Sequence, residues 1–326
     1  MTKAVMIRKQ GGPEVMELVE LKLAAPQAHE VVLRHTAIGA NLVDTYHRMN
    51  TTGQYAIETP AVLGFEAVGV VEDVGDAVEN VSIGDRVAYC MVLGAYCERR
   101  IIAADQLVRI PDSVSDETAA ACFIKGLTAQ YLLSSTYKVG EGDTILIHAA
   151  AGGVGSIMSQ WARHLGATVI GTVGSESKGR MAKANGCEHI IYYREVDFVE
   201  EVLRLTEGHG VDVVYDSVGV DTFEGSLKCI RPLGTLVNYG QASGPVPPFD
   251  ISKLAANGSI FLAKPTLGTY IAQPGRQQRM SDSLFDMIER GIVSMEVSQT
   301  VRLENVQELH RDFEARRTSG SVVVIP

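Results

Sequence analysis

The stretch "ILIHAAAGGVGSIMSQWA" (145–162) joins an apolar run to a helix-like segment through a turn that contains Gly152, Gly153 and Gly155. A strand, a tight turn and a helix N-terminus in this order bind a pyrophosphate through free N–H groups and the helix dipole. A glycine at 152 or 153 lets the backbone approach the phosphates, and Gly155 lets the helix pack on the strand. Because Ala150 takes the first glycine position, the strict GxGxxG pattern is absent. A tight turn without a ligand is the alternative interpretation.

Strand and helix patterns alternate after this turn. Helix-like segments, for example 155–166 and 198–208, separate most of the apolar runs. This alternation predicts an α/β fold with a doubly wound parallel sheet that is covered on both faces. The six predicted strands are 144–149, 168–173, 189–191, 211–216, 234–239 and 259–263.

The first ~120 residues are β-rich, with short apolar segments separated by Gly, Pro, Asn and Asp, which is typical of a small barrel or sandwich. A capped helix is predicted over 115–133, another helix over 279–291, and a terminal strand at "SVVVIP" (321–326). We expect this tail to return to the first domain. The predicted domains are therefore 1–123 with 265–326, and 124–264.

The composition is that of a soluble globular protein, with 46% hydrophobic and 21% charged residues among 326. No apolar run reaches the ~18 residues needed to cross a bilayer, and the N-terminus lacks the pattern of a signal peptide. Five scattered cysteines without a CxxC pair indicate free thiols in a reducing compartment. We therefore expect a cytoplasmic protein without a membrane segment. The net charge of -10 argues against a nucleic-acid partner.

The segment "GTVGSESKGR" (171–180) follows the second predicted strand, where an NAD-specific protein usually places an acid against the ribose 2′-hydroxyl. Here Gly174 and Ser175 are followed by Glu176 and Lys178. A serine can donate a hydrogen bond to a 2′-phosphate and a lysine supplies positive charge, so the segment favours NADP over NAD. Alternatively, Lys178 is an ordinary solvated residue at the start of a helix.

With "AAAGGVG" (149–155), "GTVGSESK" (171–178), "YYRE" (192–195) and "VYDSVG" (214–219), the chain resembles the bacterial quinone oxidoreductases of the zeta-crystallin type. These belong to the medium-chain dehydrogenase/reductase superfamily. The resemblance extends over almost the whole chain, including "AIGANLVDTY" (37–46), "KGLTAQYLL" (125–133) and "GSVVVIP" (320–326). It implies a GroES-like β-barrel catalytic domain, a Rossmann domain and an active site in the cleft between them. In such relatives the fingerprint is AxxGxxG, which Ala149, Gly152 and Gly155 match.

The resemblance also implies NADPH as the cofactor and assigns site residues. The 2′-phosphate pocket of the family uses a serine or threonine, a lysine and a tyrosine, which correspond to Ser175, Lys178 and Tyr193. Asn41, Tyr46 and Thr128 match positions that line the nicotinamide end of the cleft, and we predict them as the catalytic set. Without the resemblance, Asn41 would be interpreted as a turn residue, Tyr46 as a half-buried aromatic residue and Thr128 as a hydroxyl on a helix. The predicted cofactor-binding residues are Gly152, Gly153, Val154, Gly174, Ser175, Lys178, Tyr193, Ser217, Tyr239, Gln241, Lys264, Pro265, Thr266 and Leu267.

The matching segments lack the metal ligands of zinc alcohol dehydrogenases. Those enzymes carry a cysteine and a histidine where this chain has Asn41, in "NLVD" (41–44), and Phe65, in "GFE" (64–66). The structural-zinc lobe needs four closely spaced cysteines, whereas only Cys90 and Cys97 lie near that place. We predict no metal site, and we expect His148 to be packed or hydrogen-bonded.

Three functions remain open. The first is a zinc-independent NADPH:quinone oxidoreductase that acts on a small quinone. The second is an NADPH-dependent enone or alkenal reductase, and the third is an NADPH-binding module with a sensing or RNA-binding role, against which the acidic charge argues. Family resemblance suggests a homodimer formed through the apolar edge strand 259–263. Because charge arriving on a quinone spreads over the ring and both oxygens, neutral hydrogen-bond donors at Asn41, Tyr46 and Thr128 could suffice.

Overall fold

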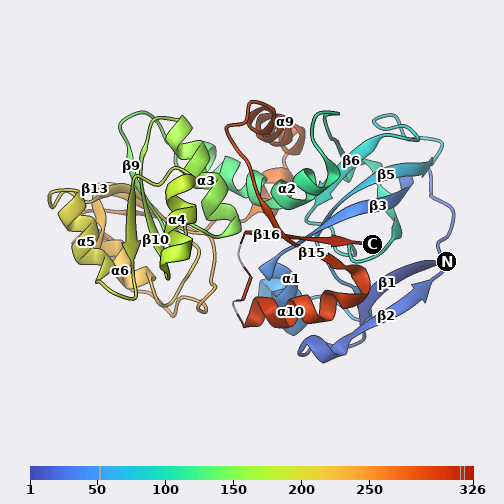
Figure 1. Cartoon of the computed structure of the whole chain (residues 1–326), viewed down its shortest axis with the longest axis horizontal. Helices are drawn as coiled ribbons and strands as arrows, with labels where there is room; N and C mark the ends of the chain where they lie inside the picture. Colours follow the sequence, from blue (N-terminus) through green and yellow to red (C-terminus); the bar gives the residue numbers. More distant parts are fainter. Residues whose placement is uncertain (51–52, 316, 319) are drawn as a thin grey trace. The chain divides into compact units, whose positions relative to one another are not determined.

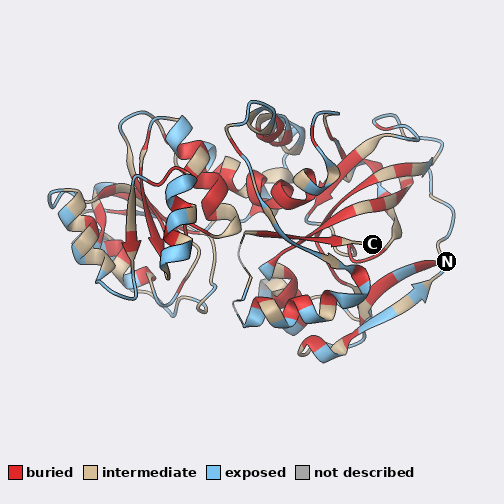
Figure 2. Ribbon diagram, in the orientation of Figure 1, coloured by how far each residue is buried: buried red, intermediate tan, exposed pale blue. Residues whose placement is uncertain are grey.

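The chain divides into two compact units. A computed structural model describes residues 1–50, 53–315, 317–318 and 320–326. Unit 1 comprises Met1–Ile124 and Met295–Pro326, and unit 2 comprises Lys125–Ser294. Figures 1 and 2 show the elements of each unit and the buried residues along their strands.

Unit 1 is built from two sheets and short helices. A three-stranded sheet has the order β2-β1-β4, and a seven-stranded sheet has the order β15-β16-β3-β5-β6-β8, with β7 paired to β3. The hydrophobic core of this unit is formed by side chains such as those of Leu33, Ile38 and Val87, all fully buried. The strands are β1 (Thr2–Ile7), β2 (Met16–Leu21), β3 (Glu30–Ala40), β4 (Ala61–Val62), β5 (Glu66–Val74), β6 (Arg86–Cys90), β7 (Arg99–Ala103), β8 (Val108–Arg109), β15 (Val297–Arg302) and β16 (Ser321–Ile325); the helices are α1 (Leu42–Met49), α10 (Val306–Glu314) and the first part of α2 (Asp116–Tyr131).

Unit 2 is a parallel six-stranded sheet with the order β11-β10-β9-β12-β13-β14. Numbered within the unit, this is the order 3-2-1-4-5-6 of the doubly wound dinucleotide-binding fold, which confirms the predicted fold class. The strands are β9 (Thr144–Ile147), β10 (Thr168–Val173), β11 (His189–Tyr192), β12 (Val211–Asp216), β13 (Ile230–Asn238) and β14 (Phe261–Ala263); the helices are α3 (Gly153–His164), α4 (Glu176–Ala184), α5 (Phe198–Leu205), α6 (Phe223–Lys228), α7 (Ser252–Ala256), α8 (Leu267–Ile271) and α9 (Arg276–Glu289).

Local signals account for several helix starts. Ser175 caps α4, where its hydroxyl accepts a hydrogen bond from the N–H of Lys178. Asp197 caps α5 by accepting hydrogen bonds from the N–H groups of Val199 and Glu200. Such caps satisfy N–H groups that lack partners within the helix, and they explain why these segments begin as helices at these residues.

The units differ from the predicted domains at the second boundary. Residues 265–294, which the sequence pattern places in the first domain, pack in unit 2. The reason is side-chain packing against the end of α2. Leu284 on α9 fills the space beside Gly126, and the ring of Tyr270 on α8 stacks on Tyr131 with centroids 4.3 Å apart. The remainder of the tail, Met295–Pro326, is part of unit 1, where β16 pairs with β3.

Candidate functional site

The turn after β9 is shaped by backbone contacts. Ala149 adopts a left-handed conformation (φ 53°), and its carbonyl oxygen accepts a hydrogen bond from the N–H of Gly152 at 2.8 Å. A Cβ on Gly155 would lie 2.5 Å from that same carbonyl oxygen and 2.9 Å from the Cα of Ala150. Only glycine lets α3 approach the turn this closely, which is the packing role expected of the third glycine in the fingerprint.

The N-terminus of α3 carries no side-chain cap. Its cap residue is Gly152, without a side-chain hydrogen bond, and Gly153 and Val154 form the first helical positions. The apolar stem of Lys125 lies over Gly153, where a Cβ would come within 2.7 Å of the Lys125 Cδ atom. An uncapped helix N-terminus is an arrangement that favours an anion.

The predicted 2′-phosphate residues lie at the carboxyl ends of two adjacent parallel strands. Gly174 and Ser175 follow β10, Lys178 is in the first turn of α4, and Tyr193 follows β11. A Cβ on Gly174 would lie 2.6 Å from the Tyr193 hydroxyl oxygen, so the tyrosine hydroxyl is next to this turn. The structure therefore brings Gly174, Ser175, Lys178 and Tyr193 together.

The loops after β12 and β13 are also joined at this edge. Asp216 accepts hydrogen bonds from the N–H groups of Val218 and Gly219 at 2.8 and 3.0 Å, and so shapes the loop that contains Ser217. Burial raises the pKa of Tyr239, which a hydrogen bond with Ser217 opposes. Gln241 accepts a hydrogen bond from the N–H of Gly244 through its backbone carbonyl.

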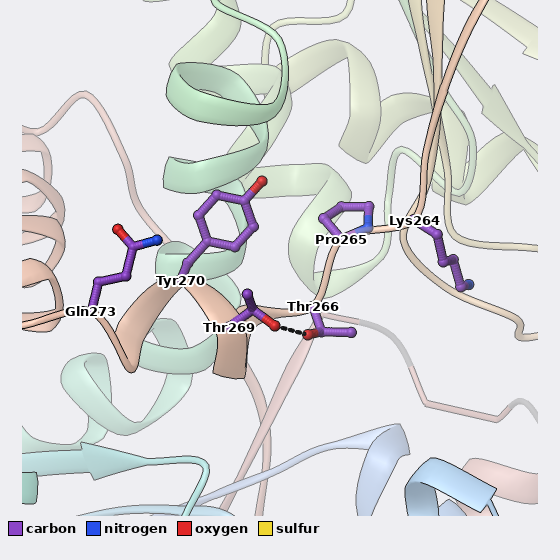
Figure 3. Close-up of a pocket in the computed structure, with 6 residues that line it drawn as sticks. All are labelled: Lys264, Pro265, Thr266, Thr269, Tyr270 and Gln273. Carbon is purple, nitrogen blue, oxygen red and sulfur yellow. Dashed lines mark hydrogen bonds between the residues drawn. The ribbon is translucent and has the colours of Figure 1, made fainter.

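The segment after β14 lines a pocket of about 350 Å³ (Figure 3). Lys264 donates a hydrogen bond to the Oδ1 atom of Asn238 at 2.6 Å, and burial lowers the pKa of Lys264 while Asp216 opposes this shift. The hydroxyls of Thr266 and Thr269 are 3.0 Å apart. Leu267, the next residue after Thr266, is buried. The pocket residues are Lys264, Pro265, Thr266, Thr269, Tyr270 and Gln273.

His148, directly after β9, is packed and hydrogen-bonded, as predicted. Its Nδ1 is 3.0 Å from the hydroxyl of Thr172, and its Nε2 is 3.0 Å from the hydroxyl of Ser226. Burial lowers the pKa of His148, which keeps the ring neutral, although Asp216 opposes the shift.

In unit 1, Asn41 and Tyr46 lie on the first turns of α1. Asn41 is the cap residue of this helix, and its Nδ2 donates a hydrogen bond to Oε1 of Glu66 at 2.7 Å. Tyr46 is half-buried, with its ring 5.1 Å from that of Tyr55. Thr128 is half-buried on the last turns of α2, in unit 2.

At the two positions that match metal ligands in zinc dehydrogenases, the side chains of this protein make other contacts. Asn41 bonds to Glu66, and the ring of Phe65 stacks on His47 at 4.1 Å. Within the described ranges, no three His, Cys, Asp or Glu side chains are grouped closely enough to hold a metal ion. The five cysteines are all buried and free of disulfides.

Sequence reasoning missed three polar residues. Glu66 and Lys125 lie within quoted motifs, but nothing in their local spacing indicated the contacts that they make. Asn238 ends β13, and its buried Nδ2 has no hydrogen-bond partner among the residues that the structure describes. Its place at the carboxyl end of a central strand is the one signal that could have identified it.

Helices in the described part of the chain are too short or too polar to span a bilayer.

Comparisons with known proteins identify the family. A family model described as "Alcohol dehydrogenase GroES-like domain" matches residues 27–141, and one described as "Zinc-binding dehydrogenase" matches residues 153–283. The chain is 46% identical to a quinone oxidoreductase of Pseudomonas aeruginosa, with all of both chains covered. It is 44% identical to a 2-haloacrylate reductase of Burkholderia, over 100% of this chain and 99% of that one.

A solved structure agrees with these matches. The Escherichia coli quinone oxidoreductase complexed with NADPH superposes with a TM-score of 0.96 at 41% identity, with both chains fully covered. Full-length identity above 40% is accompanied here by the same fold, so the expected resemblance is confirmed. The chain belongs to the quinone oxidoreductase family.

Proposed function

We propose that this chain is an NADPH:quinone oxidoreductase that transfers reducing equivalents from NADPH to a small quinone. The observation that carries the proposal is the turn at 149–155, which lies after the first strand of a 3-2-1-4-5-6 sheet. A dinucleotide binds such sheets at the carboxyl edge, where the strand order reverses between β9 and β12. The NADPH complex of the Escherichia coli relative supports the choice of cofactor.

The residues present fit NADPH. A Cβ would lie 3.1 Å from the Ala149 carbonyl oxygen at Gly152 and 2.5 Å from it at Gly155, so small residues suit this turn. The uncapped N–H groups of α3 suit a pyrophosphate. Ser175, Lys178 and Tyr193 would hold the 2′-phosphate with two hydroxyl groups and one ammonium group. When bound, NADPH supplies a hydride, or its one-electron equivalent, from its nicotinamide ring.

The remaining predicted residues extend along the same edge. Gly174 leaves room for the Tyr193 hydroxyl. Ser217, Tyr239 and Gln241 follow β12 and β13, and Lys264 to Leu267 follow β14, so each loop would cover part of an extended dinucleotide. Their assignment to cofactor binding rests on this placement and on the family resemblance.

At the acceptor, the tyrosine and threonine hydroxyls would donate hydrogen bonds. We assign Asn41, Tyr46 and Thr128 to the acceptor end on the family resemblance. Both amide hydrogens of Asn41 are held by protein acceptors, Glu66 Oε1 at 2.7 Å and the carbonyl oxygen of Gly39 at 3.3 Å. We therefore assign hydrogen-bond donation to a quinone oxygen to the hydroxyls of Tyr46 and Thr128. Removal of the Tyr46 hydroxyl should slow turnover without abolishing it.

A screen of acceptors tests this function. Initial rates of NADPH and NADH oxidation would be measured with benzoquinone, naphthoquinone, enones, 2-chloroacrylate, aldehydes and, in reverse, alcohols. We expect quinones with NADPH to be the fastest pair. Faster turnover of aldehydes or alcohols than of quinones would contradict the proposal, because a localised alkoxide needs a Lewis acid or a strong proton donor. Oxidation of NADPH by any acceptor would also remove the alternative of a pure sensing or RNA-binding module.

Reduction of an activated alkene is the second candidate function. The 44% identity with a 2-haloacrylate reductase over the full length favours it specifically. The same screen separates the two activities, since a kcat/KM for 2-chloroacrylate or an enone above that for every quinone would assign the chain to alkene reduction.

We also propose that catalysis is independent of zinc. Support comes from the amide of Asn41 and the ring of Phe65 at the positions of the thiolate and imidazole ligands in zinc enzymes. Purified protein should contain well under one zinc ion per chain, and a chelator should leave the rate unchanged. Stoichiometric zinc in elemental analysis would contradict this.

A homodimer in the cytoplasm is the assembly that we propose. Strand β14 is at the end of the unit 2 sheet, and Phe261 on it is 62% exposed. An exposed apolar edge strand invites pairing with another chain. Light scattering should give a dimer mass for the wild type and a monomer mass for Phe261→Lys; an unchanged dimer in the variant would place the interface elsewhere.

A further inference from the structure

Glu66 is a buried carboxylate for which the proposed chemistry has no direct use. It begins β5 and is 1% exposed. One carboxylate oxygen, Oε1, accepts a hydrogen bond from Nδ2 of Asn41 at 2.7 Å, and the other, Oε2, accepts one from the backbone N–H of Ile124 at 2.7 Å. A single side chain therefore bonds to the cap residue of α1 and to the backbone of α2.

The neighbouring backbone makes room for this carboxylate. A Cβ on Gly39 would collide with the Glu66 carboxylate and with the carbonyl oxygen of Ala120. Ile124 follows Ala120 by four residues, so Oε2 receives a hydrogen bond from an N–H group that lies inside the helical ladder of α2. Buried carboxylates persist where hydrogen bonds of this kind satisfy them, and the contacts of Glu66 are of this kind.

The carboxylate determines the orientation of the Asn41 amide. A carboxylate can only accept hydrogen bonds, so it fixes the NH2 end of the amide toward Glu66. The other amide hydrogen points to the carbonyl oxygen of Gly39 at 3.3 Å. The backbone N–H of Asn41 is held in turn by Oδ2 of Asp44 at 2.9 Å. Asn41 is therefore fixed from both sides at the start of α1.

We propose that Glu66 is a positioning residue that acts through Asn41: the pair fixes the first turns of α1, which carry Tyr46, and the segment of α2 one turn before Thr128. This inference rests on the proposed function, in which the hydroxyls of Tyr46 and Thr128 contact the acceptor. It assigns Asn41 a supporting role and excludes it as a hydrogen-bond donor to the substrate.

An exchange of the two side-chain types tests the pairing. Glu66→Gln removes one acceptor, because its amide can accept from Ile124 or from Asn41 but not from both. Asn41→Asp puts two carboxylates together. Combined, the two substitutions restore the hydrogen bond in reverse, with the new glutamine donating to the new aspartate while still accepting from Ile124. The net charge and the number of heavy atoms are unchanged in the double variant.

We expect each single substitution to lower kcat with the best acceptor by about 10- to 100-fold, the effect of losing one charge-assisted hydrogen bond. The double variant should recover most of this loss, and the Kd for NADPH should stay within about twofold throughout. If Asn41 instead donates to the substrate, the double variant will be as slow as Asn41→Asp alone, since a carboxylate cannot donate. That result would overturn the proposal.

Two further measurements keep the test decisive. Glu72→Gln, on the same strand but in a half-buried ion pair with Arg34 and Arg99, is the control and should leave kcat unchanged. If Glu66→Gln does not fold, the pH profile of Asn41→Asp decides. Two carboxylates in contact share one proton at lower pH, so kcat should rise as the pH falls from 8 to 6 relative to wild type; parallel profiles would contradict the pairing.

The proposed function and this inference can fail separately. A wild type that reduces no quinone contradicts the function alone. In that case Tm still tests the pair, because the double variant should regain the Tm lost by the single variants. Additive losses of Tm would overturn the pairing even in a wild type that is fully active.

Discussion

The two units build their candidate sites in different ways. In unit 2, the turn after the first strand of the sheet requires space beside backbone atoms, as at Gly155. In unit 1, the candidate residues of α1 are held by side chains from distant parts of the chain. The difference teaches that a backbone-defined site depends on local residue types, whereas a side-chain-defined site depends on long-range partners.

A chain of buried polar groups illustrates the second kind. Arg48 donates to Nδ1 of His310 at 3.0 Å and forms an ion pair with Glu314. The hydrogen of His310 is therefore on Nε2, which is 3.3 Å from the hydroxyl of Tyr96. Tyr96 donates to Oδ2 of Asp44 at 2.8 Å, next to the bond from Asn41. Helices α1 and α10, side by side in Figure 1, are joined by this network.

The largest expected effect is the sensitivity of unit 1 to acid. Burial lowers the pKa of His35 and of His310 to about 3, whereas both titrate near 6.5 when unfolded. Both rings contribute stability above pH 6.5 that is lost as the pH falls toward 3. The loss should be about 2 kcal/mol per histidine between pH 6.5 and 5, measured as the free energy of unfolding in urea.

A variant isolates one of these histidines. In His310→Gln, the dependence of unfolding free energy on pH over this range should be shallower by about 1 kcal/mol per pH unit. The exposed His164→Gln, in unit 2, is the control and should retain the wild-type slope. A slope in His310→Gln equal to that of the wild type would show that His310 is not held neutral.

The next effect breaks the backbone-defined edge. Gly155→Ala places a Cβ 2.5 Å from the carbonyl oxygen of Ala149, so the turn or α3 must shift. Overpacking of this kind costs about 1–3 kcal/mol of stability. Because the N–H groups at the start of α3 are displaced, the affinities for NADPH and for NADH should fall to the same extent. Gly140→Ala, with open space at its Cβ position, is the matched control. Unchanged nucleotide affinity in Gly155→Ala, by fluorescence titration, would remove the turn from the site.

Lys178→Ala tests the charge at the same edge. A charge-assisted hydrogen bond contributes roughly 1.5–3 kcal/mol, so the affinity for NADPH should fall about 10- to 100-fold with little change for NADH. Lys183→Ala, on the same helix α4 but bonded to the carbonyl of Glu188, should leave the preference for NADPH intact. Equal losses for both nucleotides in Lys178→Ala would make this lysine structural.

The smallest effect concerns backbone strain in the turn. Ala149 has a φ of 53°, a conformation that costs an L-residue about 1–2 kcal/mol and glycine almost nothing. Ala149→Gly should therefore raise the unfolding free energy by under about 1 kcal/mol, after the entropy that glycine adds to the unfolded chain. Ala151→Gly, outside the left-handed region, should be neutral or destabilising. If Ala149→Gly is less stable than Ala151→Gly, the backbone at Ala149 is not strained.

Most strands of unit 2 could be predicted from the apolar runs in the sequence. The bounds of β10 and β12 coincide with the apolar runs 168–173 and 211–216. Strand β13 instead begins four residues before the predicted 234, at Ile230, because the pairing with β12 is irregular there. Pro232 lacks an N–H group and Leu233 has a φ of 61°, so a run that reads as a turn is accommodated within the strand.

The sequence by itself determined the parallel sheet and the glycine turn, because each depends on residues that are neighbours in the chain. The assignment of Ser175, Lys178 and Tyr193 to one pocket rested on the family resemblance. Only the tertiary structure decided that Asn41 bonds to Glu66, that His310 is neutral, and that residues 265–294 pack on α2. Buried polar groups must find partners, but their spacing in the chain does not specify which. The Arg48–His310 contact joins residues 262 positions apart, and only the packed core brings them together.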